Sequence, residues 1–306
     1  MLSDIAGLLT RKLLDVVSGA YPNIVVVAAI CTALTLFSSQ ACNPGKVWWR
    51  GRDLLIDSCY WLTIQLIGPY IRTGLLVAFS TVIMCFTSAD ALNSYIDHGK
   101  GPIGAASFWW QVAIYLIVSD FLLYWIHRVF HGERMWGYHA IHHSAEQVDW
   151  TTSYRFHPVN LCLGPFLVDA IMLYLGVAPA VLLYLVPFQA MSAMFVHANL
   201  NWTFGPLKYV VATPVFHRWH HSPPDQGGNK NFAPTFSLWD ALFGTFYMPP
   251  GRLPETYGVD DAQFPRGFLG QLIYPFVTRE RTAGGLAQSL SASASAIGSA
   301  GPLPRS

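Results

Sequence analysis

Residues 108–143 read FWWQVAIYLIVSDFLLYWIHRVFHGERMWGYHAIHH, an apolar run that passes directly into two groups of histidines. The part from Phe108 to Ile126 is long enough to cross a bilayer as one helix, because a span needs about 20 mostly apolar residues. His127 and His131 follow it four residues apart, a spacing that places both side chains on one face of a helix. The stretch therefore predicts a membrane helix that ends in a pair of metal-ligating imidazoles.

The composition of the whole chain also indicates a membrane protein. Of its 306 residues, 53% are hydrophobic and only 11% are charged, whereas soluble domains carry about 25% charged residues. Too few charges remain to cover a water-facing surface. The net charge of +1 lacks the concentrated basic surface that nucleic-acid binding usually needs, so no nucleic-acid partner is expected.

Three further apolar regions are expected to enter the membrane, namely residues 24–37, 54–86 and 159–196. The second is interrupted at Gly68-Pro69 and can be one broken span or a hairpin. The third is too long for one span and is interrupted by Pro179 and Pro187, so we expect two helices folded back on each other. A hairpin there returns the chain to the same membrane face and brings the histidines on its two sides together.

Basic residues predict which face that is, because they mark the cytoplasmic side of membrane proteins. The histidine-bearing segments contain Arg128, Arg134, Arg155, Lys208, Arg218 and Lys230. The expected fold is therefore an all-α integral membrane protein. About four to six transmembrane or re-entrant helices should lie under a cytoplasmic helical cap that holds a histidine-rich two-metal site.

The same reading divides the chain into four parts. Residues 1–107 are expected to form an N-terminal membrane region and residues 108–250 the catalytic domain. Residues 251–280 should form a C-terminal cap segment. The tail, residues 281–306, is rich in Ala, Ser and Gly and is expected to be disordered.

The histidines form the strongest functional signal, because all of the 11 except His98 lie between residues 127 and 221. Three clusters read HRVFH (127–131), HAIHH (139–143) and HRWHH (217–221), with spacings of three and four residues that share a helix face. Imidazole binds zinc, copper, iron and nickel. Eight to ten histidines are enough for two ions with four or five ligands each. The sequence has no HExxH motif, so it lacks the glutamate base of a zincin protease.

These strings, with FHP at 156–158 and the flanks FVHAN (195–199) and NFA to LWD (231–240), resemble the fatty acid hydroxylase/sterol desaturase superfamily of membrane di-iron enzymes. The resemblance covers residues 127–246. It implies that the metal ligands are His127, His131, His139, His142, His143, His217, His220 and His221, with His157 and His197 as additional ligands.

The resemblance also implies the chemistry. It predicts an oxidoreductase that uses two iron ions and O2 to hydroxylate or desaturate a C–H bond of a membrane lipid, such as a sterol or a fatty acyl chain. Zinc can substitute in a site of this kind. The sequence contains no flavin, nicotinamide or haem motif, so an external electron donor is expected, either a ferredoxin or a cytochrome b5-like protein with its reductase.

Several polar residues are candidates to support the site. Asp120 lies seven residues before His127, on nearly the same helix face, and can accept a hydrogen bond from a ligand imidazole or join two helices. Asn201 lies four residues after His197 and is a candidate partner of the site or a polar helix-end residue. Glu146, Asp149 and Asp240 are further candidates, or else caps and surface charges.

Two other functions fit a histidine-rich membrane protein, a zinc hydrolase and a metal-binding or transport protein. A transporter would line a path through its spans with histidines. Here the clusters follow the spans in sequence, which favours a site at one end of the bundle. A hydrolase would turn over without O2.

Overall fold

The computed structural model describes residues 52–84 and 88–277, together with residues 7, 25, 26, 28–33, 36 and 42. Over this part of the chain the structure is helical and contains no strand, as expected. The tail 281–306 lies outside the described residues, and the apolar region 24–37 falls among them only in part.

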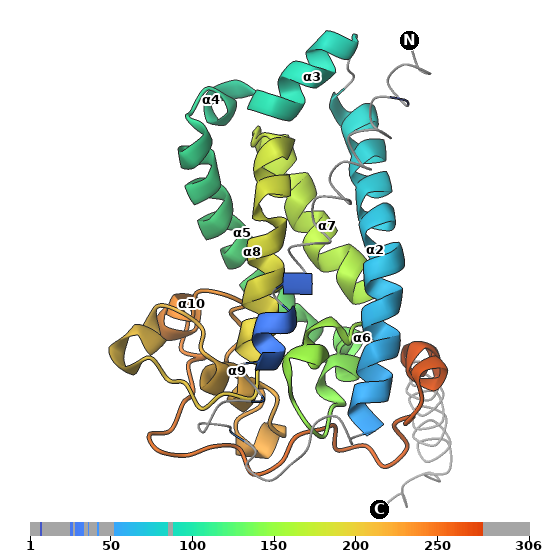
Figure 1. The fold of residues 1–306 in the computed structure, drawn as a ribbon, viewed down its shortest axis with the longest axis vertical. Helices are drawn as coiled ribbons and strands as arrows, with labels where there is room; N and C mark the ends of the chain where they lie inside the picture. The colour runs from blue at the N-terminus through green and yellow to red at the C-terminus, as the bar shows by residue number, and fades with distance from the viewer. Residues whose placement is uncertain are drawn as a thin grey trace, which may run out of the picture.

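Four long helices form a bundle, and their chain direction places the histidines at one end (Figure 1). They are α2 (Arg52–Met84), α5 (Phe108–Phe130), α7 (Pro158–Leu175) and α8 (Pro179–His197). At the end remote from the histidines, the short helices α3 (Ala89–His98) and α4 (Gly101–Gly104) connect α2 to α5. Helices α5 and α8 therefore both finish at the same end, with His127 and His197 in their last turns.

Three of the described helices, α5, α7 and α8, are long and apolar enough to cross a membrane. Helix α2 has 33 residues and runs unbroken through Gly68 and Pro69, so the alternative of a hairpin there is wrong. At 1.5 Å per residue it is about 50 Å long, well beyond the roughly 30 Å of a hydrocarbon core. Its first turns consequently reach the histidine end and pack there against other elements.

The expected hairpin over residues 159–196 is confirmed, because α7 and α8 are joined by a turn of three residues at 176–178. Gly176 ends α7 in a left-handed conformation with φ 109°. A Cβ on it would lie 2.1 Å from the carbonyl oxygen of Lys100, so only glycine lets the chain turn this close to the α3–α4 connection. Pro179 then starts α8 at a position where its missing N–H costs nothing.

The shorter elements gather at the histidine end of the bundle (Figure 1). They are α6 (Glu133–His143), η2 (Trp150–Tyr154), η3 (Gly205–Tyr209), α9 (Pro214–His220), η4 (Pro224–Gln226) and α10 (Leu238–Leu242). A further apolar helix, Phe268–Val277, packs Phe268 and Leu272 against Ile56 and Tyr60 of α2. These elements form a cap over one end of the bundle.

Candidate metal centre

Four helices deliver the histidines to one place. Helix α5 ends in the first cluster, α6 ends in the second, α8 ends at His197, and α9 with its C-cap residue His221 carries the third. Helix α9 begins sharply because the Thr213 hydroxyl accepts a hydrogen bond from the Phe216 N–H at 3.1 Å and Pro214 follows the cap.

Nine histidines form two groups, and within each group the potential ligand atoms lie within 4.8 Å of one another. The five-histidine group contains His127, His131, His139, His143 and His220, and the four-histidine group contains His142, His197, His217 and His221. The two groups are contiguous, since the neighbouring residues His142 and His143 belong to different ones and their ring centroids lie 5.6 Å apart. The donor set is therefore suited to two ions.

Hydrogen bonds to the outer imidazole nitrogens show that the five-histidine group fits a cation. His127 Nδ1 lies 2.6 Å from the carbonyl oxygen of Phe232, and His139 Nδ1 lies 2.7 Å from Asn160 Oδ1. Carbonyl oxygens only accept, so both Nδ1 atoms carry the hydrogen and both Nε2 atoms carry a lone pair. Those two Nε2 atoms are 2.9 Å apart. Two lone pairs at that distance repel each other unless a positive ion binds both.

The other members of the five-histidine group also present nitrogen atoms that a cation could bind. His220 Nδ1 donates to the carbonyl oxygen of Lys230 at 2.8 Å, so its Nε2 also presents a lone pair. The Nε2 atoms of His131, His143 and His220 are buried and have no hydrogen-bond partner among the described residues. A buried polar atom without a partner is costly, and a bound ion would satisfy all three.

The four-histidine group converges on His197. Its Nδ1 donates to the carbonyl oxygen of Ala193 at 2.7 Å, so its Nε2 is an acceptor. Three other Nε2 atoms lie 2.9 to 3.2 Å from it, those of His142, His217 and His221. The single lone pair of His197 Nε2 cannot accept hydrogen bonds from three donors. Nitrogens that bind one ion at about 2.0–2.1 Å lie roughly 3.0–3.4 Å from one another, so the observed separations fit four ligands of a single ion.

Burial keeps these imidazoles in the form that binds metal. It lowers the pKa well below the ordinary histidine value, with neighbouring imidazoles lowering it further, for the six cap histidines His139, His142, His143, His217, His220 and His221. A histidine must be neutral to bind a metal ion. The site is therefore ready to bind near pH 7 and below it.

The same pKa shifts predict an acid-sensitive metal-free protein. An unfolded histidine takes up a proton below about pH 6.5, while the buried histidines do not, so protonation favours the unfolded state. Stability is fully present above that pH and should fall as the pH decreases below it, by at most roughly 1 kcal/mol per pH unit for each such histidine. Melting temperatures of chelator-treated protein between pH 8 and 5 measure this. His98→Ala, which removes an exposed histidine, should leave the profile unchanged, and a flat wild-type profile would contradict the prediction.

A loop after α9 holds the outer faces of two ligands, His127 and His220, in place. Asp240, which is fully buried, accepts hydrogen bonds from the N–H groups of Phe232 and Ala233, both at 2.8 Å. Asn231 adopts a left-handed conformation (φ 59°) and donates from its side chain to the carbonyl oxygens of Phe216 and Tyr247. These bonds orient the Lys230 and Phe232 carbonyls toward His220 and His127. Asp240 is thus neither a cap nor a surface charge. The string Leu238-Trp239-Asp240, which resembles the family's, was the feature of the sequence that pointed to its role.

Asp120 supports the same loop without contacting a ligand. Its carboxylate accepts from the Phe236 N–H and from Trp239 Nε1, both at 3.0 Å. No bond from Asp120 to a histidine is present among the described residues. The direct role suggested for it by helix periodicity is therefore corrected to an indirect one, through the segment that carries Phe232.

Two expected site residues lie elsewhere. His157 is outside both groups, since its Nδ1 accepts from the Val159 N–H at 3.0 Å to cap α7 and its Nε2 faces the Leu272 carbonyl oxygen at 3.2 Å. Asn201 is exposed. Helix α8 ends at His197, so the four-residue spacing to Asn201 no longer places the two side chains on one face.

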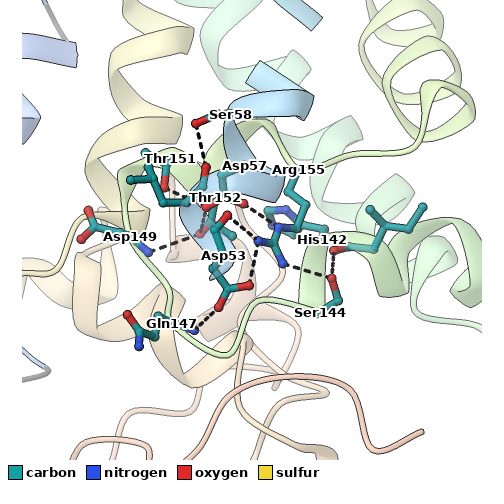
Figure 2. A network of polar contacts seen from close by, with 12 residues as sticks. Asp53, Asp57, Ser58, His142, Ser144, Gln147, Asp149, Thr151, Thr152 and Arg155 are labelled. Carbon is teal, nitrogen blue, oxygen red and sulfur yellow. Dashed lines mark hydrogen bonds and ion pairs between the residues drawn. The ribbon is translucent and has the colours of Figure 1, made fainter. Parts of the chain in front are cut away.

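Figure 2 shows a buried ion-pair network behind the second histidine cluster, which the sequence did not predict. Arg155 donates to Asp57 Oδ1 at 2.5 Å, to Asp53 Oδ1 at 2.9 Å and to Ser144 Oγ at 3.3 Å. Asp57 also accepts from the hydroxyls of Thr151 and Thr152. The network ties the start of α2 to the end of α6 and to η2.

A second buried arginine, Arg218, donates to the carbonyl oxygens of Val148 and Ala198 at 2.6 and 3.2 Å. Arg155 and Arg218 are at most 1% exposed. Neither side chain faces the water beside a membrane, so these two arginines do not support the expectation that basic residues mark this end as the cytoplasmic side.

An elongated cavity of about 510 Å³ leads from the histidines into the bundle. Helices α2, α5, α7 and α8 all contribute to its wall, which is mainly apolar, with side chains such as Ile67, Leu123 and Val186. At the cap end it reaches five of the nine histidines, namely His127, His139, His142, His197 and His217. A long apolar molecule in this cavity would present one part of its chain to both histidine groups.

Comparison with known proteins adds to this geometry. Residues 112–245 match the model of a family described as fatty acid hydroxylase. The chain is 35% identical, over 64% of its length, to an ornithine lipid hydroxylase of Rhizobium tropici, and covers 58% of that protein. It is 32% identical over 49% of its length to an alkylglycerol monooxygenase of Caenorhabditis elegans, and 27% identical over 44% to a methylsterol monooxygenase of Arabidopsis thaliana, covering 30% and 46% of those proteins. No solved structure matches the chain.

Proposed function

We propose that this chain, whose residues 112–245 match the fatty acid hydroxylase family, is an O2-dependent oxidoreductase with two iron ions that hydroxylates or desaturates a C–H bond of a membrane lipid. The observation that carries the proposal is the pair of histidine groups at the end of an apolar cavity. In the five-histidine group, two Nε2 lone pairs 2.9 Å apart favour a cation bound between them.

Each group would hold one ion, with five imidazoles for one and four for the other. Iron bound there would supply the activation of O2 that attack on an unactivated carbon requires. The chain's own residues supply geometry. The Phe232 and Lys230 carbonyls and Asn160 fix the orientation of their imidazoles, and ligand orientation by such partners is worth about 10–100-fold in metal affinity or activity. The cavity wall aligns the lipid and excludes water.

The membrane placement follows from the helices. Helices α5, α7 and α8 are apolar over their lengths, and all nine histidines lie at one end of the bundle, which we propose to be the cytoplasmic end. A water-soluble ferredoxin or a cytochrome b5-like protein with its reductase would then deliver electrons to the cap. A transport path is disfavoured, because both histidine groups lie at one end of the helices and do not line a route between them.

Iron loading and isotope labelling test the proposal together. The full chain is purified in mild detergent, loaded anaerobically with ferrous iron, and examined by metal analysis and Mössbauer spectroscopy. We expect two coupled irons per chain. Addition of a reductant and 18O2 to loaded protein in membranes should then yield a lipid that carries one 18O atom, or one that has lost two hydrogens while O2 is consumed. One tightly bound zinc per chain with O2-independent turnover would contradict the proposal and favour a hydrolase.

A further inference from the structure

The cavity contains a polar site far from the histidines. Asp169 of α7 accepts from Arg72 Nε of α2 at 2.7 Å and from the Tyr115 hydroxyl of α5 at 2.7 Å. Gln189 of α8 donates from its amide nitrogen to the Tyr115 oxygen at 3.2 Å. All four side chains line the cavity, and each comes from a different helix of the bundle. We name these four residues the anchor site.

The anchor site lies at a defined distance from the metal centre. Tyr115 precedes His127 by 12 residues on α5, and Gln189 precedes His197 by eight residues on α8. At 1.5 Å per residue these separations are about 18 Å and 12 Å. Ionisable groups within membrane helices are expensive and mark functional positions. Here they open onto the apolar cavity that we propose to hold the lipid.

The charges of the anchor site determine what it can bind. Two guanidinium nitrogens of Arg72, Nε and Nη2, contact one oxygen of Asp169, while Tyr115 donates to the other oxygen. The Asp169 side chain is 1% exposed and that of Arg72 is 31% exposed. The pair is neutral as a whole, so an anionic ligand would compete with Asp169 for Arg72 and be repelled by it. An uncharged ligand meets no such repulsion and finds donors on Arg72 and an acceptor in the Gln189 amide oxygen.

We propose that the anchor site binds an uncharged hydrogen-bonding group of the lipid, a hydroxyl or the carbonyl of an ester or amide, and so sets which carbon reaches the histidines. The second half of this statement rests on the proposed function, whereas the binding itself does not. The oxidised carbon then lies about 12–18 Å from the bound polar group. The position of oxidation is counted from that group and not from the end of the chain.

Ligand competition tests the binding without metal or turnover. The purified full chain, treated with chelator, is offered equimolar 1-hexadecanol, hexadecanoate and hexadecane in one detergent, and bound ligand is measured by native mass spectrometry. The three ligands share one chain length and differ in their polar end. Ratios between ligands are compared between variants, so that partition into the micelle cancels.

Wild-type protein should prefer hexadecanol to both other ligands. Gln189→Leu removes an acceptor for the ligand, and Tyr115→Phe removes the hydroxyl that holds the Gln189 amide and Asp169 in place. Each substitution should reduce the ratio of hexadecanol to hexadecane by roughly 2- to 10-fold, the size of the effect of one hydrogen bond. Tyr95→Phe is the matched control, because Tyr95 is also a buried tyrosine whose hydroxyl joins two helices: it donates from α3 to the Leu173 carbonyl oxygen of α7 at 3.1 Å. Tyr95 does not line the cavity. This variant should keep the wild-type ratio.

A change of preference gives a second test. Asp169→Asn leaves Arg72 without its carboxylate, so this variant should bind hexadecanoate better than hexadecanol. If it does not fold, the Tyr115 and Gln189 variants still decide the matter. Equal ratios in wild type, Tyr115→Phe and Gln189→Leu would overturn the proposal and leave the network as a helix-packing contact. A wild-type preference for hexadecanoate would also overturn it.

The position of the new oxygen or double bond separates this proposal from the proposed function. If the enzyme oxidises a lipid, Tyr115→Phe and Gln189→Leu should spread the oxidation over neighbouring carbons, while Tyr95→Phe keeps a single position. A di-iron enzyme whose products are unchanged in both anchor variants would retain the function and reject the anchor. Selective hexadecanol binding by a protein that binds no iron would retain the anchor site and reject the proposed function.

Discussion

His220→Ala and His142→Ala should each release one of two iron ions and reduce lipid oxidation by at least roughly 100-fold. His220 belongs to the five-histidine group and His142 to the four-histidine group, so each variant addresses a different ion. Changes in residues that merely orient ligands cost about 10–100-fold, and removal of a ligand should exceed that range. Metal analysis and Mössbauer spectra of iron-loaded protein give the count, and lipid analysis gives the activity.

His157→Ala is the matched control for both variants. His157 is as well buried as the ligands, at 5% exposed, but lies outside both groups and caps α7. It should keep two irons per chain while losing up to about 1–2 kcal/mol of stability as a lost helix cap. Retention of both irons in His142→Ala and His220→Ala, or loss of one in His157→Ala, would contradict the assignment of the groups.

Arg155→Met should destabilise the protein by about 3–5 kcal/mol, the usual effect of removing one partner of a buried ion pair. Methionine fills part of the space but leaves the carboxylate of Asp57, which is 1% exposed, without its cation. The Ser144 hydroxyl, next to His143, also loses its contact with Arg155. Thermal unfolding of the metal-free protein in detergent, followed by the soluble fraction after heating, measures the loss.

A second substitution tests the cause of this effect. Arg155→Met combined with Asp57→Asn removes the unpaired charge and should recover part of the stability. Arg252→Met replaces an exposed arginine and should change the unfolding temperature little. If Arg155→Met unfolds with wild-type behaviour, the network in Figure 2 contributes little to stability.

The histidine spacing predicted the ligands better than it predicted their grouping. In every cluster the two histidines four residues apart enter the same group, as His127 with His131, His139 with His143, and His217 with His221. The histidine between them, His142 or His220, enters the other group. Spacing along one helix shows which side chains share a face, but the facing helix determines which nitrogens converge.

Sequence spacing was a poorer guide to the polar residues around the histidines than to the histidines themselves. Periodicity placed Asp120 on the face of His127, yet its carboxylate binds the loop before α10. Sequence distance from His197 suggested Asn201, but α8 ends first. Asp240 is 113 residues from His127 in the sequence. Only the folding back of its loop brings Asp240 to Phe232, whose carbonyl oxygen contacts His127.

By itself the sequence determined the helical class, the apolar bundle, the hairpin of α7 and α8 and the three clusters that hold eight of the nine converging histidines, because composition and local periodicity report burial and shared faces. The ninth, His197, was expected only from the family resemblance. Only the tertiary structure decided how those histidines divide between two ions, that His157 stands apart, and that arginines counted as surface charges lie inside the cap. It also joined Arg72, Tyr115, Asp169 and Gln189 from four helices into one site. Each of these depends on contacts between residues distant in the chain, which no local pattern specifies.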